Sequence, residues 1–219
     1  MATVAVIGWK GGVGKSAVAV ALALRALEDG LRVAVVDCDP QRSSARWLEA
    51  AAPELPVVQV EQDPTDPAGA VLRAVTAAEE LADLVICDPP PSAAEVLRAL
   101  ALAADVALVP TGASVEEVAL AGRSLEVLES VARFRGGAAR PLVVLTRIDT
   151  RTGLGREAQE TAATLGAPVA STALRYRVAW LEAVAAGCTL RALGSQGTEA
   201  AKEVDALWSE VVELLEVTR

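Results

Sequence analysis

The residues with the clearest chemical potential lie near the start of the chain, in a glycine-rich stretch that ends in Gly14-Lys15-Ser16. Those three residues form the end of the phosphate-binding pattern G-x-x-x-x-G-K-[ST], although Trp9 stands where that pattern has its first glycine. A second form of the pattern, K-G-G-x-G-K-[ST], fits completely from Lys10 to Ser16. Glycines let the backbone curl so that successive N–H groups point at phosphate oxygens. We therefore predict a phosphate-binding loop in which Lys15 reaches the β- and γ-phosphates and the Ser16 hydroxyl binds Mg²⁺.

Lysine usage supports this prediction. Of the 20 basic residues only three are lysines, and two of them, Lys10 and Lys15, lie in the loop. A compact ammonium on a flexible stem suits a phosphate cradle better than a planar guanidinium. Two other interpretations remain: a glycine-rich turn without a ligand, and a dinucleotide-binding G-x-G-x-x-A fingerprint from Gly12 to Ala17 with Asp37 ending the next strand. The fingerprint leaves the Lys-Ser pair and the acidic strand ends unexplained.

Acidic residues end two of the apolar runs that we predict as strands. Asp37 and Asp39 follow the run that begins at Val33, and Asp88 ends the run that begins at Leu84. In an open parallel sheet, ligands lie at the carboxyl ends of the strands, where carboxylates can hold Mg²⁺ or orient an attacking water. A single strand-end aspartate is more often a loop or helix cap. Because two such strands occur together with a complete phosphate loop, we favour roles for these aspartates in holding Mg²⁺ and orienting an attacking water.

These side chains need a sheet to position them, and short β-branched runs that alternate with longer Ala/Leu-rich stretches predict one. We expect an α/β fold: a single P-loop NTPase domain over residues 1–219, with a mostly parallel twisted sheet and helices on both faces. The predicted strands are Thr3–Ile7, Arg32–Asp37, Val57–Val60, Leu84–Asp88, Val106–Val109, Leu142–Thr146 and Pro168–Ala170. The predicted helices span 15–29, 42–51, 67–81, 92–103, 114–134, 154–165, 177–186 and 199–217. Helix C-caps are expected at Gly30, Gly166 and Gly187. The last helix combines an apolar face with acidic residues, so we expect it to pack on the sheet rather than on a membrane surface.

The composition limits the remaining classes of protein. The 219 residues are 53% hydrophobic but only 3% aromatic, which suits one α/β domain with a core of Ala, Val and Leu. No apolar run approaches the roughly 18 residues of a membrane span, and no export signal opens the chain. We therefore expect a cytoplasmic protein with no membrane partner. Three cysteines without C-x-x-C spacing are expected as reduced thiols, and the absence of histidine excludes His-based catalysis and His-ligated metal.

The net charge of −9 is unevenly distributed along the chain. Residues 1–122 hold 8 Lys and Arg against 17 Asp and Glu, whereas residues 131–191 hold 9 Arg against 4 acids. An acidic protein can therefore carry a local basic face for a polyanion. We select five arginines as DNA-binding candidates, and the alternative for each is a salt-bridged surface: Arg147, Arg151, Arg156, Arg175 and Arg177.

Three motifs together make the chain resemble the ParA/MinD group of deviant Walker A ATPases. They are Lys10-Gly-Gly-Val-Gly-Lys15-Ser16, Val36-Asp37-Cys-Asp39-Pro40-Gln41 and Asp88-Pro-Pro-Pro-Ser92. With the order of helices and strands, the resemblance covers nearly the whole chain. It implies that ATP and Mg²⁺ are the cofactors and that ATP binding forms a homodimer with the nucleotides between the two subunits.

The resemblance also implies a role for individual residues. Lys10 would be the signature lysine that reaches the partner's nucleotide, and Lys15 would bind phosphates within its own subunit. Asp39 would activate the hydrolytic water, and the residues expected at the metal are Ser16, Asp39 and Asp88. The backbone contacts implied are Gly11, Gly12, Val13, Gly14 and Ala17, and the residues expected near the purine are Thr146 and Arg147.

The function implied by the resemblance is a nucleotide switch whose ATP-bound dimer binds DNA nonspecifically and hydrolyses ATP when a partner stimulates it. We rank first a nucleoid-associated DNA partition ATPase for plasmids or chromosomes, with a ParB-like centromere-binding partner. The alternative is a ParA/MinD-like ATPase that positions a protein assembly or division machinery, and a dinucleotide oxidoreductase ranks third. We expect no sequence-specific operator binding, because no N-terminal DNA-reading domain precedes the first strand. We also expect no MinD-like basic membrane anchor and no iron–sulfur cluster.

Overall fold

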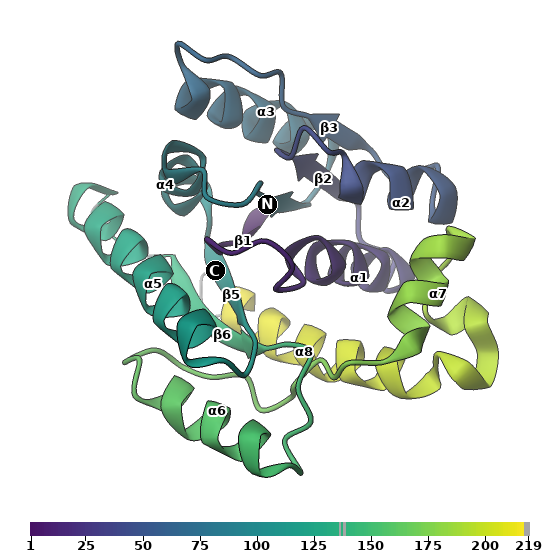
Figure 1. The fold of residues 1–219 in the computed structure, drawn as a ribbon. Helices are drawn as coiled ribbons and strands as arrows, with labels where there is room; N and C mark the ends of the chain where they lie inside the picture. Colours follow the sequence, from purple (N-terminus) through teal and green to yellow (C-terminus); the bar gives the residue numbers. More distant parts are fainter. Residues whose placement is uncertain (136, 138, 217–219) are drawn as a thin grey trace.

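The computed structural model describes residues 1–135, 137 and 139–216, which form six strands and eight α-helices (Figure 1). The strands are β1 (Ala2–Val6), β2 (Val33–Asp37), β3 (Val57–Gln59), β4 (Leu84–Asp88), β5 (Val106–Thr111) and β6 (Arg140–Leu145). The helices are α1 (Lys15–Glu28), α2 (Ser43–Ala51), α3 (Pro67–Leu81), α4 (Ala94–Ala103), α5 (Val115–Arg135), α6 (Gly153–Ala163), α7 (Val178–Ala186) and α8 (Thr198–Glu216), with a 3₁₀ helix η1 (Arg191–Gln196) before α8.

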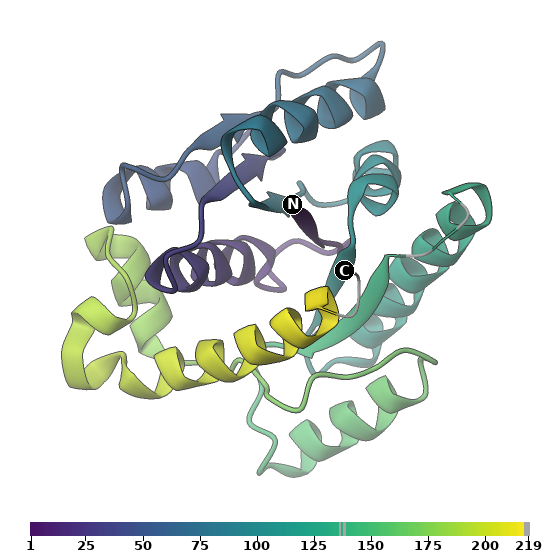
Figure 2. The ribbon, with the colours of Figure 1, turned by 180° about the vertical axis from the view of Figure 1, so that it is seen from behind.

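All six strands run parallel, in the order β3-β2-β4-β1-β5-β6, so their carboxyl ends lie along one edge. Side chains alternate between the two faces because the strand period is two. Val4 and Val6 point into the core under α1, α2, α7 and α8, whereas Ala5 and Ile7 point into the core under α3, α4 and α5, with α6 beside α5. Figures 1 and 2 show these two helical layers from opposite sides. The predicted fold class is confirmed, with a sheet that is parallel throughout its described strands.

Glycines lie at or just beyond the ends of three helices. The predicted C-cap is confirmed at Gly187, whereas the C-caps of α1 and α6 are Asp29 and Thr164, and Gly30 and Gly166 follow them by one and two residues. Gly30, Gly166 and Gly187 have positive φ angles of 80°, 77° and 57°, a region that glycine enters without the strain of a Cβ. At Gly187, a Cβ would also lie 2.5 Å from the Cβ of Ala50 in α2. This glycine therefore allows the end of α7 to pack closely on α2.

The predicted strand Pro168–Ala170 is wrong. Val169 forms a single bridge to Val143 of β6, the edge strand, and the N–H of Ser171 then donates to Oε2 of Glu210 in α8 at 3.0 Å. Because this donor turns away from the sheet, no ladder develops.

The helix predicted over 199–217 is α8, and residue 217 lies outside the described residues. Helix η1 was not predicted.

The last helix packs on the sheet, as expected. Leu207 and Val211 of α8 are fully buried in the core that includes α1. The indole Nε1 of Trp208 donates to Oδ2 of Asp29 at 2.7 Å, which joins α8 to the end of α1. Figure 2 shows α8 crossing this face of the molecule beside α1.

Among the helices that the structure describes, none has the length and apolar character that a bilayer crossing requires.

Candidate nucleotide site

The glycine-rich loop joins β1 to α1 at the carboxyl edge of the sheet. Gly12 and Gly14 have positive φ angles of 77° and 89°, and a Cβ at Gly12 would meet no atom within 4 Å. Gly14 is the N-cap of α1 and makes no side-chain cap, so it leaves the N–H groups of the first turn without a capping side chain. The buried Thr146 hydroxyl donates to the Val13 carbonyl at 2.8 Å and anchors the loop to the segment after β6. The loop is thus curled, open and held in place, which fits the binding of phosphate by backbone N–H groups.

The Lys15 ammonium lies inside this loop. Only 6% of the residue is exposed, and Nζ donates to the Lys10 carbonyl at 2.9 Å. Burial lowers the pKa of Lys15 below its ordinary value, while the nearby carboxylates of Asp88 and Asp39 act in the opposite direction. The loop and the two acidic strand ends therefore meet in space, as their positions in the sequence predict.

Asp88 has the features of a magnesium-supporting carboxylate. Its side chain is fully buried; Oδ2 accepts a hydrogen bond from the Ser44 hydroxyl at 2.5 Å, and Oδ1 is buried without a hydrogen-bond partner in the described part of the chain. Burial raises the pKa of Asp88 to about 6, against smaller lowering effects of the Ser16 and Ser44 hydroxyls and of Lys15. The described residues contain no group of three or more acidic, His or Cys side chains suited to a metal. A mixed site of one hydroxyl, one or two carboxylates and nucleotide phosphates is the arrangement that Mg²⁺ favours, so Ser16 and Asp88 fit that metal.

The two aspartates at the end of β2 have different positions. Asp37 is fully buried, and its carboxylate accepts hydrogen bonds from the N–H groups of Asp39 and Ala45, both at 2.9 Å, which fix the turn and the start of α2. Asp39 is partly exposed, and its Oδ1 accepts from the N–H of Gln41 at 2.8 Å. Asp37 therefore shapes the backbone, and Asp39 is the carboxylate that faces the loop.

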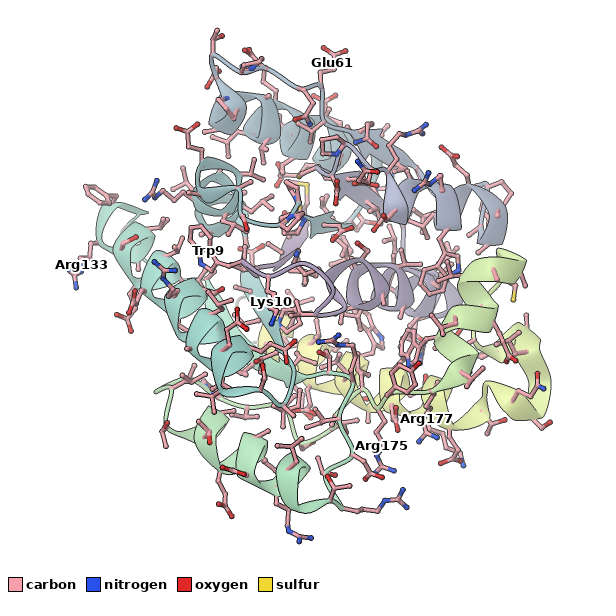
Figure 3. All side chains as sticks on the ribbon, viewed as in Figure 1. Trp9, Lys10, Glu61, Arg133, Arg175 and Arg177 are labelled. Atoms are coloured by element: carbon pink, nitrogen blue, oxygen red, sulfur yellow. The ribbon has the colours of Figure 1, made fainter. Side chains whose placement is uncertain are left out.

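Lys10 does not reach across the loop of its own subunit. Its ammonium donates to Oε2 of Glu116, at the start of α5, at 3.1 Å; Lys10 is partly exposed and Glu116 is exposed. Figure 3 shows Lys10 between the loop and α5. The neighbouring Trp9 is half-buried against the core under α4 and α5, and its carbonyl accepts from the N–H and the hydroxyl of Ser92. The Trp9 ring therefore covers the core.

An apolar cleft of about 140 Å³ opens next to the start of α1. It is lined by Gly14, Ala17, Val18, Thr146, Arg147, Leu174, Arg175, Tyr176, Arg177, Trp180 and Leu181. An apolar cleft beside a phosphate loop suits a purine. The predicted purine neighbours Thr146 and Arg147 both line it, and the guanidinium of Arg147 pairs with Glu117 at 2.5 Å.

The remaining DNA-binding candidates are paired with protein groups. Arg175 and Arg177 share Glu203 of α8, which lies 3.6 Å and 2.6 Å from their guanidinium groups. Arg151 pairs with Asp149 at 2.7 Å, and Arg156 donates to the Arg151 carbonyl at 2.9 Å. Figure 3 places Arg175 and Arg177 side by side below α7, far from Arg133 at the end of α5.

Four residues of this region were missed from the sequence: Ser44, Gln59, Glu116 and Glu203. Ser44, Glu116 and Glu203 each contact a residue that the sequence predicts for the site, but each contact joins positions 26 or more residues apart. No local pattern marks such a contact.

The comparisons with known proteins agree with this geometry. The sequence pattern of the CobQ/CobB/MinD/ParA nucleotide binding domain matches residues 4–190. The chain is 30% identical over 215 residues to "Maintenance of carboxysome distribution protein A" of Halothiobacillus neapolitanus, with 96% of both chains covered. It is 33% identical over 217 residues to the protein of the same name in Gloeobacter kilaueensis, with 97% of this chain and 93% of that one covered.

Solved structures agree in fold. The ATP complex of a McdA variant from Cyanothece aligns with a TM-score of 0.76 at 19% identity, covering 99% of this chain and 96% of that one. The MinC:MinD complex of Aquifex aeolicus aligns with a TM-score of 0.75 at 14% identity, covering 97% and 96%. At these identities the structural likeness concerns the fold alone.

Proposed function

The chain belongs to the CobQ/CobB/MinD/ParA family of nucleotide-binding proteins, and from this premise we propose that it is an ATPase that distributes a protein assembly within the cell. One observation carries the choice of cargo: the chain matches two proteins named for carboxysome distribution over almost their whole lengths. Sequence motifs alone ranked DNA partition first. The relatives favour the alternative, the positioning of a protein assembly, and we propose a protein-shelled compartment of the carboxysome kind as that assembly.

The residues of the site support a Mg-ATP-dependent switch. The loop from Gly11 to Ala17 would cradle the phosphates, with Lys15 against their charge and Ser16 and Asp88 at the metal. Bound Mg-ATP supplies a phosphoanhydride bond whose hydrolysis sets the lifetime of the ATP-bound state. Asp39 would orient the attacking water, because its carboxylate is partly exposed and acts electrostatically on Lys15 of the loop. We assign the apolar cleft to the purine.

Lys10 supports a homodimer. Its ammonium points out of its own loop towards α5 and is partly exposed, so a second subunit could receive it without a change in the core. We propose that ATP binding brings two chains together and that each Lys10 then serves the nucleotide of the other subunit. Turnover would be stimulated by a cargo-bound partner protein rather than by a ParB-like centromere-binding protein.

We propose that the dimer uses nonspecific DNA of the nucleoid as its support. The arginines around α6 and α7 are the candidate contacts, and each phosphate contact would steepen the salt dependence of binding. The variant Arg175→Ala/Arg177→Ala is expected to weaken ATP-dependent DNA binding and to lower the salt slope, whereas Arg133→Ala, on α5, should change neither. Because the double variant removes both guanidinium partners of the buried Glu203 and leaves it only the backbone N–H of residue 175, Arg151→Ala/Arg156→Ala serves as the second test. DNA binding that is unchanged in both double variants would remove these arginines from the contact.

The cargo is tested in the cell. A fluorescent shell protein of the host's compartment should be evenly spaced in wild-type cells and should collect into clusters when Lys15→Ala replaces the wild-type residue. Plasmid and chromosome inheritance is measured in the same cells. Evenly spaced compartments together with frequent loss of DNA would reject the proposed cargo and restore DNA partition.

A further inference from the structure

We propose that Gln59, at the end of edge strand β3, is a positioning residue for Asp39. This inference rests on the ATPase proposed above, in which Asp39 orients the attacking water. The side-chain amide Nε2 of Gln59 donates to the carbonyl of Asp37 at 2.9 Å and to the carbonyl of Asp39 at 3.2 Å. One side chain thus connects β3 both to the last residue of β2 and to the turn that carries Asp39.

The pairing of β2 with β3 does not require this side chain. Asp37 and Gln59 are register partners, and the N–H of Val60 already donates to the Asp37 carbonyl at 3.0 Å. The Gln59 amide adds a second donor to that carbonyl and extends past the end of the strand to Asp39. Its contact with Asp39 is therefore separate from the formation of the sheet.

The other half of the Gln59 amide indicates why a glutamine stands here. Its Oε1 is buried and has no hydrogen-bond partner in the part of the chain that the structure describes. A buried polar atom without a partner destabilises a fold, so an apolar side chain of similar length would serve packing better. The donor Nε2 is the part of the side chain that makes contacts, and both of its acceptors belong to the segment that ends in Asp39.

With Gln59, each polar group of the Asp39 backbone is held. The N–H donates to Oδ1 of Asp37 at 2.9 Å, and the carbonyl accepts from the N–H of Arg42 at 2.9 Å as well as from Gln59. The carboxylate is restrained through Oδ1 by the N–H of Gln41. Asp37, Gln41 and Arg42 all lie within three residues of Asp39, whereas Gln59 lies 20 residues away. Gln59 is therefore the contact that ties the turn to a neighbouring strand and sets its position relative to the phosphate loop.

A loss of this contact is expected to affect the chemical step and not the binding of ATP. A displacement of a reacting group by about 1 Å can lower a rate about a hundredfold. Gln59 does not line the apolar cleft assigned to the purine, and its amide donates to the carbonyls of Asp37 and Asp39. For Gln59→Met, which keeps the length of the side chain and removes the donor, we expect kcat to fall by about ten- to a hundredfold and KM for ATP to change less than about twofold.

The test compares three variants with the wild type by phosphate release from Mg-ATP in the presence of DNA. Gln59→Met and Gln59→Glu both lack the donor, and Gln59→Glu keeps the shape of the side chain in case one variant folds poorly. The matched control is Gln62→Met, because Gln62 follows three residues later and makes only a 3.5 Å contact with the Val60 carbonyl. A normal kcat in a folded Gln59→Met or Gln59→Glu would overturn the assignment, as would an equal loss in Gln62→Met.

A double-mutant cycle separates positioning from a general structural effect. In the Asp39→Ala background, Gln59→Met should lower the residual turnover no further, because the group that it positions is gone. Full additivity of the two losses would overturn the role of Gln59. Wild-type protein that binds ATP and never releases phosphate would reject the ATPase itself, which distinguishes failure of the proposed function from failure of this inference alone.

Discussion

Asp88→Asn should make the nucleotide-free protein more stable. The carboxylate is fully buried, and its pKa is raised from 3.8 to about 6 in the fold, so the charged form is disfavoured there. One pKa unit corresponds to about 1.4 kcal/mol, so the folded protein is less stable by about 3 kcal/mol at pH 8 than it would be with a neutral group at this place. An asparagine can still accept the hydrogen bond from Ser44. Allowing for imperfect packing of the new amide, we expect a gain of about 1–3 kcal/mol.

The pH dependence identifies the cause. The pKa of Asp88 is higher in the folded protein than in the unfolded chain. Below pH 3.8 the carboxyl is protonated in both states, and the fold keeps its full stability. That stability is lost as the pH rises through about 6, because the buried group then becomes charged. The advantage of Asp88→Asn should therefore be largest at pH 8 and about half as large at pH 5. For a chain of this size, 1 kcal/mol shifts Tm by about 2–4 °C, so we expect Tm to rise by about 2–12 °C at pH 8. Thermal unfolding with EDTA and without nucleotide measures this directly, and Mg-dependent ATP turnover should be lost in the same variant.

Asp37→Asn is the matched control. Burial raises the pKa of Asp37 too, but both of its carboxylate oxygens accept backbone hydrogen bonds, from Asp39 and Ala45. An asparagine offers one oxygen for two N–H groups, so one donor is left unpaired and the variant should be less stable by about 1–3 kcal/mol. A Tm for Asp88→Asn that is unchanged or lower at pH 8, or a gain that does not vary with pH, would refute the reasoning.

Three further predictions concern the loop, the turn and one helix end. Glu116→Gln releases Lys10 from an exposed ion pair worth up to about 1 kcal/mol. Because the dimer contains two such pairs, it should form with ATP at up to about thirtyfold lower protein concentration; identical sizing profiles for variant and wild type would count against this restraint. Asp39→Ala should keep ATP affinity, lower turnover by about a hundredfold or more and prolong the dimer, and unchanged phosphate release would remove Asp39 from its role. Gly187→Ala places a Cβ 2.5 Å from that of Ala50 at a φ of 57° and should lower stability by about 1–3 kcal/mol, which an unaltered melting curve would contradict.

The phosphate loop could be predicted from the sequence because its chemistry is local. The conformation that binds phosphate is dictated by consecutive glycines before a helix, and Lys15 and Ser16 occupy fixed places in that pattern. The strand ends were predictable for a related reason: a fully buried parallel strand is a continuous apolar run, so an aspartate at its end is conspicuous. Asp37 and Asp88 are register partners at the ends of β2 and β4.

The supporting residues were not predictable, because their partners are distant in the chain. Ser44 and Gln59 are ordinary polar residues in the sequence, and only the pairing of β2 with β3 and β4 brings one to Asp88 and the other to Asp39. The division of labour between Asp37 and Asp39 depends in the same way on α2, whose first turn provides the N–H of Ala45 that occupies Asp37.

The count of arginines in the sequence overstates the positive charge that the folded chain presents. The surplus of arginine over residues 131–191 is reduced by Glu117 and Glu203, which lie outside that window. Arg175 and Arg177 share one carboxylate, and Arg156 pairs with a carbonyl and with no acid among the described residues.

The five candidate arginines have three carboxylate partners among the described residues, so they leave one chain about two uncompensated positive charges. We expect one chain to bind DNA weakly through them, because each phosphate contact changes the salt slope by only about 0.9. A dimer doubles the number of contacts and makes the second set intramolecular, which raises affinity without any new residue. In the proposed mechanism, DNA binding that depends on ATP thus requires no conformational change around the five candidate arginines. It requires only the pairing of two chains that each carry them.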